Sequence, residues 1–199
     1  LFESAYNLVT QKILPNTYSN IGLSGGLNVG YGPILVYLYS IILFFWRDIY
    51  SLYLFSIILW TIAIYFTYKI GKDFFNNKTG LISACFVAFH PIALYATNDN
   101  SNGIFTASFA AIFIYSLYQI KFNRNVKYWI LCFFSLGFLL QIHASAFVSV
   151  FILAVFMLFQ PKLSGKHIFL GLLVFLLLFA SIQLEVPVSH LDRTPSKDT

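Results

Sequence analysis

The sequence contains little charge. Only 10% of its 199 residues are Asp, Glu, Lys or Arg, against about 25% in an average soluble domain. Hydrophobic types make up 59%, including 23 Phe and 13 Tyr. A soluble domain of this length could not hide so much apolar surface, because much of any compact chain faces water. The composition excludes a soluble globular domain and a disordered chain. It predicts an all-α, polytopic bundle of transmembrane helices.

Cysteine is also scarce. Cys85 and Cys132 both lie in apolar stretches, where cysteine acts as a small hydrophobic residue. Neither a disulfide nor a metal site follows from them. No signal-peptide pattern precedes the first loop, and the glycine-rich stretch 21–33 lacks the spacing of a phosphate-binding loop. The sequence indicates no cofactor, while a divalent metal stays open. In a membrane chain the net charge of +5 marks cytoplasmic loops and not nucleic-acid binding.

The apolar stretches predict about six spans, since a spanning helix needs about 17–25 residues. The run 128–159 is too long for one span and divides at its most polar point, 141–145. The short run 34–46 is rich in Tyr and Trp, which predicts a helix in the outer leaflet; a tilted span is the alternative. The expected single membrane domain consists of an extracytoplasmic loop 1–33, the interfacial helix 34–46, transmembrane helices 49–68, 81–97, 104–120, 128–141, 145–159 and 168–184, and an extracytoplasmic tail 185–199.

Basic residues fall on one side of these spans. The loops 69–78, 121–127 and 162–166 hold 8 of the 12 basic residues and a single acid, Asp73. The positive-inside rule makes this side cytoplasmic. The other six acids lie on the opposite side, which is therefore predicted to be extracytoplasmic.

Several loops bring polar residues to this predicted outer side. Polar groups near membrane depth are costly and are functional candidates by default. Each also has a structural interpretation: Asp99 as a solvated turn residue, and Gln141 with His143 as a turn at the membrane surface. The candidates are Glu3, Asp99, Asn102, Gln141, His143 and Ser145.

An ordered set of segments resembles a known family. The segments are Leu14-Pro15, the stretch Gly32–Leu38, the helix end Tyr68–Phe75, Asn102 and the element Leu140–Ala146, which contains Gln-x-His-x-Ser-Ala. They are similar to the bacterial GT-C glycosyltransferases of the dolichyl-phosphate-mannose protein mannosyltransferase and ArnT-like type. These multi-pass membrane enzymes use polyprenyl-phosphate sugars.

The resemblance implies a reaction and a set of roles. A sugar would move from a polyprenyl-phosphate donor to a hydroxyl of a lipid, glycan or protein, by inverting displacement at the extracytoplasmic face. Glu3 would act as general base or acceptor orienter and Asp99 as the second acid, although the spacing places the family's usual Asp at Phe2. Sugar or phosphate contacts would come from Asn102, Gln141, His143 and Ser145. The family has further helices on both sides, so we expect this chain to be a piece of a longer enzyme.

Three alternatives remain open at this point. A transporter or flippase would favour charges at mid-membrane and broken helices in repeats, whereas the helix middles here carry no charge. An O-antigen-type polymerase or ligase also acts on lipid-linked sugars outside, and the long first loop argues mildly against it. A structural membrane subunit is the third.

Overall fold

The computed structural model describes residues 2–11, 21–22, 28–29, 34–91, 102–123, 126–142 and 146–159, together with 165, 169, 172, 173 and 176. Its helices are α1 (Phe2–Gln11), α2 (Ile34–Phe45), α3 (Ile49–Phe74), α4 (Asn77–Ala88), α6 (Asn102–Asn123), α7 (Val126–Ile142) and α8 (Phe147–Leu158). Two short antiparallel strands, β1 (Ile21–Gly22) and β2 (Asn28–Val29), form a ribbon. The predicted all-α bundle is confirmed, with this ribbon as a small addition.

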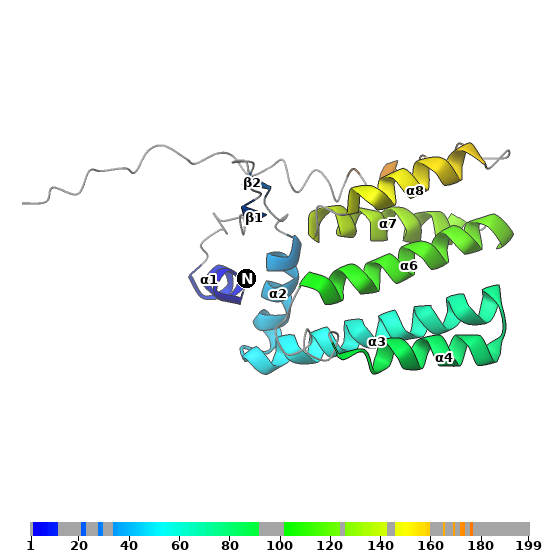
Figure 1. The fold of residues 1–199 in the computed structure, drawn as a ribbon. Coiled ribbons are helices and arrows are strands. Elements are labelled where there is room, and N and C mark those ends of the chain that lie inside the picture. The colour runs from blue at the N-terminus through cyan, green and yellow to red at the C-terminus, as the bar shows by residue number, and fades with distance from the viewer. Residues whose placement is uncertain are drawn as a thin grey trace, which may run out of the picture.

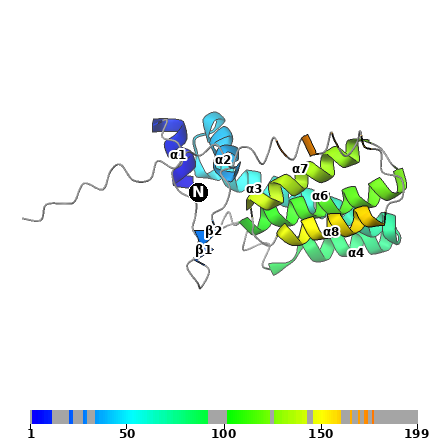
Figure 2. The same ribbon diagram turned by 90° about the horizontal axis from the view of Figure 1, so that it is seen from above.

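The long helices lie side by side (Figure 1). The α3 helix packs against both α4 and α6, α6 packs against α7, and α8 contacts α6 and α7. The short helix α2 lies across one end of this bundle at a steep angle, and α1 packs on α2. Figure 2 shows α1, α2 and the ribbon gathered at that same end.

Two described helices are long and apolar enough to cross a membrane, Ile49–Phe74 and Gly103–Phe122. Three others are apolar but shorter: Ile34–Phe45, Lys127–Ile142 and Phe147–Leu158. Large hydrophobic side chains cover the outside of the bundle, as a lipid solvent requires; Phe86 and Phe151 are 76% and 70% exposed. The interior is also apolar and centres on Phe105, Phe113 and Leu139.

Small residues allow close contact between helices inside the bundle. The Ser108 hydroxyl of α6 donates at 2.8 Å to the Leu59 carbonyl of α3 and at 2.8 Å to the Ile104 carbonyl of its own helix. Ser108 and Ser56 are both fully buried. Small and hydroxylated residues at such contacts are typical of helices packed in membranes, where burying apolar surface drives no association.

The structure extends α3 well past the predicted end at residue 68. The helix continues through Lys69 and Lys72 to Phe74, because loss of hydropathy marks the membrane surface and does not end a helix. It begins at a capped end, where the Asp48 carboxylate accepts from the Tyr50 backbone N–H at 3.1 Å. Asp48 therefore acts as an N-cap, which satisfies a donor that the first turn leaves unpaired.

The helix predicted over 81–97 starts earlier and ends sooner. Asn76 caps α4 by accepting from the Thr79 backbone N–H at 2.9 Å. The helix ends at Ala88, and Pro91 follows three residues later. Proline disfavours helical geometry in the residue before it, which here is His90. Residues 92–101 lie outside the described part of the chain.

The remaining predicted segments show smaller differences. The helix expected over 104–120 is α6, which begins two residues earlier and ends three residues later. The helix expected over 128–141 is α7, which begins two residues earlier and ends one residue later. The long run 128–159 is divided between α7 and α8. The predicted loop 1–33 contains α1 and the ribbon, so it is not irregular throughout. The predicted helix 168–184 and tail 185–199 lie almost wholly outside the described residues.

The bundle has two chemically different ends. The basic end holds the carboxyl ends of α3 and α6 and the starts of α4 and α7, and its described charges are Lys69, Lys72, Asp73, Lys78, Lys121 and Lys127. The α2 end holds α1, α2, the starts of α3 and α6, and the carboxyl end of α7 (Figure 1). Between the two ends, the described helices contain no charged residue.

Candidate functional site

The candidate site lies at the α2 end, and α2 itself shapes it. One face of this helix is buried in the protein through Leu35, Tyr39 and Leu43. The Ser40 hydroxyl donates to the Val36 carbonyl at 2.7 Å and to the Ala5 carbonyl of α1 at 3.3 Å. The contact fixes α1 against α2, with Ala5 fully buried between them.

Phe105 joins three helices at this end. Its ring centroid lies 5.7 Å from that of Tyr39 in α2 and 5.9 Å from that of Phe55 in α3. Phe105 is fully buried and lies in the first turn of α6, directly after Ile104. The start of α6 is thus held firmly beneath α2. Burial also raises the pKa of the Tyr39 phenol far above its ordinary value, so Tyr39 stays neutral.

Two predicted substrate-binding residues lie at this end. Asn102 is the first residue of α6, three positions before Phe105. Gln141 is the penultimate residue of α7, is 1% exposed, and precedes the fully buried Ile142. The helix α2 contacts α7, and the buried Gln141 lies at the carboxyl end of α7, which is at the α2 end of the bundle (Figure 1).

The other predicted site residues are described in part or not at all. Glu3 lies in α1, two residues before the buried Ala5; the structure describes its backbone. Asp99, His143 and Ser145 lie outside the described residues. Of the six candidates, the structure therefore places Glu3, Asn102 and Gln141 on elements that meet at the α2 end.

A groove lies between α1 and α2. It measures about 480 Å³ and is lined by Leu8 and Val9 of α1 and by Tyr37, Ser40, Ile41, Phe44 and Phe45 of α2. This volume lies within the ~300–1,000 Å³ of small-molecule sites. The signal in the sequence was the apolar character of α2 on both faces. One face packs on the bundle, and the other leaves Ile41 and Phe44 58% and 65% exposed.

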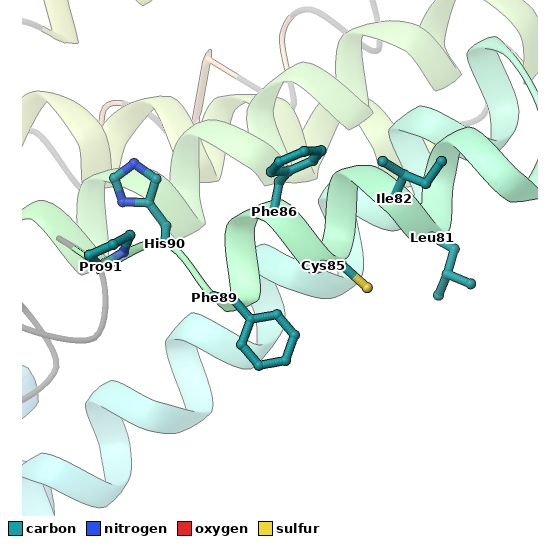
Figure 3. A pocket seen from close by; sticks show the side chains of 7 residues that line it. All are labelled: Leu81, Ile82, Cys85, Phe86, Phe89, His90 and Pro91. Carbon is teal, nitrogen blue, oxygen red and sulfur yellow. The ribbon is translucent and has the colours of Figure 1, made fainter.

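A second hollow, of about 500 Å³, runs along α4 (Figure 3). Leu81, Ile82, Phe86 and Phe89 line most of it, and His90 stands at its end beside Pro91. Phe86 and Phe89 are each 76% exposed. A face of this kind suits contact with lipid hydrocarbon, and a single imidazole at its end does not make it a polar substrate site.

The part of the chain that the structure describes contains no cluster of metal-binding side chains. Within those residues, no three His, Cys, Asp or Glu side chains lie close enough to hold a metal ion. Cys85 and Cys132 are free thiols on different helices. The described polar side chains at the α2 end include Ser40, Arg47, Asp48 and Gln141.

Comparison with protein families identifies the chain. Residues 32–183 match the model of the dolichyl-phosphate-mannose-protein mannosyltransferase family, over about three quarters of the sequence. The chain belongs to this family. It is a membrane glycosyltransferase of the GT-C type, as the ordered motifs predicted. No curated protein and no solved structure gave a significant match. The match covers α2 and the helices of the bundle, whereas α1 and the ribbon lie before its first residue.

Proposed function

We propose that the chain transfers a sugar from a polyprenyl-phosphate donor to an acceptor hydroxyl at the α2 end, and that this end faces the extracytoplasmic side. The family membership supports glycosyl transfer. One observation supports the proposed location. The elements bearing Glu3, Asn102 and Gln141 lie at the same end of the bundle as the apolar groove beside Ser40. The charge distribution supports the sidedness, because basic residues accumulate on cytoplasmic ends.

The proposed reaction is a direct displacement. The acceptor oxygen attacks C1 of the sugar while the bond from C1 to the phosphate oxygen breaks. A carboxylate takes the acceptor proton, and we assign this role to Glu3, with Asp99 as the second acid. The polyprenyl phosphate leaves with its electron pair, so inversion at C1 follows and no covalent enzyme intermediate forms.

Stabilisation of the leaving phosphate needs hydrogen-bond donors. The backbone N–H groups in the first turn of α6, from Asn102 onward, have no partner within their own helix, and a helix start favours an anion. We assign the remaining contacts to the side chains of Asn102, Gln141, His143 and Ser145. The apolar groove between α1 and α2 would accept part of the polyprenyl chain.

The experiment uses the full-length parent protein, purified in detergent and given polyprenyl-phosphate sugars. Release of polyprenyl phosphate is measured for wild type, Glu3→Gln and Asp99→Asn. Loss of a general acid–base group costs typically 10²–10⁴-fold in rate. Asp48→Asn is the matched control, because it removes an acid at the same end while asparagine keeps the N-cap of α3.

The outcomes separate the parts of the proposal. If the wild type and Asp48→Asn turn over a donor and Glu3→Gln does not, the result supports both the reaction and the role of Glu3. Turnover that survives in Glu3→Gln would leave the reaction standing and show the assigned base to be wrong. Absence of turnover with every donor would favour a transporter, which sugar flux into vesicles would then measure.

A further inference from the structure

A further cavity lies at the basic end, away from the proposed reaction. It measures about 490 Å³ and is formed by α3, α6 and α8; Figure 2 shows α8 running alongside α6. Its polar side chains are Asp73, Tyr118 and Lys121, and its apolar wall includes Ile114, Ile152 and Phe156. The cavity therefore has a charged edge near the helix ends and a hydrocarbon interior, the pattern of an amphipathic ligand.

Three aromatic rings in contact with one another form part of the wall of this cavity. The Tyr118 ring centroid lies 4.3 Å from that of Phe74 and 4.6 Å from that of Phe122. The Tyr118 hydroxyl donates to the Asp73 backbone carbonyl at 2.8 Å, which joins α6 to the end of α3. This bond fixes the backbone that carries Asp73, so the carboxylate is held at the cavity edge.

Two opposite charges at the edge do not neutralise each other. Among the described residues, Asp73 and Lys121 form no ion pair, although both line the cavity. The Asp73 carboxylate accepts a hydrogen bond from Gln119 Nε2 at 3.3 Å. The Lys121 ammonium lies 5.8 Å from the Phe122 ring centroid. Each charge keeps capacity for a ligand group of the opposite sign.

Helix stability does not explain the position of Asp73. It stands in the last turn of α3, where the helix dipole disfavours a negative charge. Lys69, four residues before it, gives the less favourable order for an ion pair along a helix. A carboxylate at this place is better explained by a cationic partner that comes from outside the helix.

We propose that this cavity binds a phospholipid with a phosphoethanolamine headgroup. The primary ammonium would meet Asp73, the phosphate would meet Lys121, and an acyl chain would lie on the wall formed by α6 and α8. A choline headgroup has the same charges but no N–H to donate, and a glycerol headgroup offers no cation to Asp73. Hydrogen-bond donation to Asp73 therefore selects phosphatidylethanolamine over phosphatidylcholine, and charge complementarity selects it over phosphatidylglycerol. The site needs no sugar donor, so it stands or falls separately from the proposed function.

The test is native mass spectrometry of the delipidated full-length protein, with phosphatidylethanolamine, phosphatidylcholine and phosphatidylglycerol of identical acyl chains. We expect a preference of about fivefold for phosphatidylethanolamine, the size of one net hydrogen bond against phosphatidylcholine and of one partly exposed charge pair against phosphatidylglycerol. Asp73→Asn keeps an oxygen for Gln119 and removes the charge, so it should abolish the preference. Lys121→Gln should weaken binding of all three lipids. Lys78→Gln, at the same end but outside the cavity, is the matched control.

Several results would overturn the site. Equal binding of phosphatidylethanolamine and phosphatidylcholine by wild type would do so without any variant. Retention of the preference in Asp73→Asn, or its equal loss in Lys78→Gln, would also exclude a role for the cavity. Ile152→Trp fills the cavity from α8 and leaves both charges in place; it should reduce binding of all three lipids, and unchanged binding would contradict the location. Melting temperatures in the same detergent confirm that each variant is folded.

Discussion

Gly71 of α3 and Gly80 of α4 meet backbone to backbone. A Cβ atom on Gly71 would lie 2.8 Å from the Gly80 Cα, and a Cβ on Gly80 would lie 2.7 Å from the Tyr68 carbonyl oxygen. Both distances are shorter than real Cβ contacts, and the neighbours are backbone atoms that cannot turn aside. The crossing of α3 and α4 near the basic end therefore requires glycine at both positions.

Substitution of either glycine should separate these helices. We expect Gly71→Ala and Gly80→Ala each to cost about 1–3 kcal/mol, the usual range for overpacking, and to lower the melting temperature in detergent. Gly165→Ala is the control, since a Cβ there meets nothing within 4 Å. Wild-type stability in both crossing variants would show that the helices are not in close contact.

The buried Ser108 predicts a different pair of effects. Ser108→Ala removes the bond to the Leu59 carbonyl and should cost only about 0.6 kcal/mol, the average for such bonds in membrane bundles. Ser108→Leu inserts volume between α3 and α6 and should cost about 1–3 kcal/mol. Thr61→Val is the control, because the Thr61 hydroxyl bonds only within its own exposed turn. Equal effects of Ala and Leu at 108 would contradict close packing.

Phe105 should control the attachment of α2. Phe105→Ala removes the ring that contacts Tyr39 and Phe55, and we expect a loss of about 3–5 kcal/mol. Release of α2 should also increase protease cleavage between α2 and α3. Phe86→Ala, at a ring that is 76% exposed on α4, should change neither measurement. An unaltered cleavage pattern in Phe105→Ala would mean that α2 is held by other contacts.

The groove between α1 and α2 can be tested by filling it. Ile41→Trp places a large ring in the groove. It should raise KM for a long polyprenyl donor and leave KM for a short-chain donor unchanged. Ile57→Trp provides the matched control, because Ile57 is similarly exposed, at 52%, but lies on α3 outside the groove. Equal effects on long and short donors would show that the polyprenyl chain lies elsewhere.

The sequence predicted the bundle well because hydropathy records burial in lipid. The division of the run 128–159 followed from its length and from polar residues at 141–145, and α7 ends at Ile142. Hydropathy could not show that α3 continues to Phe74, since the helix simply leaves the apolar region. Mean hydropathy also missed α1, because this helix is amphipathic: its apolar residues Phe2, Ala5 and Val9 recur at helical spacing among polar ones.

The candidate site was predictable only as a list of residues on one side. Glu3, Asn102 and Gln141 do lie on elements that meet at the α2 end, because alternating helices return to the same end. The groove depends on the angle at which α1 packs on α2, through Ser40 and Ala5. Such an angle leaves no pattern in the sequence. The cavity beside Asp73 likewise depends on how α8 lies against α6.

The central claim is that the α2 end, where we place the reaction, faces outward and the basic end faces the cytoplasm. The direct measurement is labelling of single cysteines in intact cells with a membrane-impermeant maleimide, using Arg47→Cys and Lys78→Cys after Cys85→Ser and Cys132→Ala. Both positions are exposed, one at each end. The account predicts that Arg47→Cys is labelled from outside and that Lys78→Cys is labelled only after lysis. Labelling of Lys78→Cys in intact cells, with Arg47→Cys protected, would contradict it.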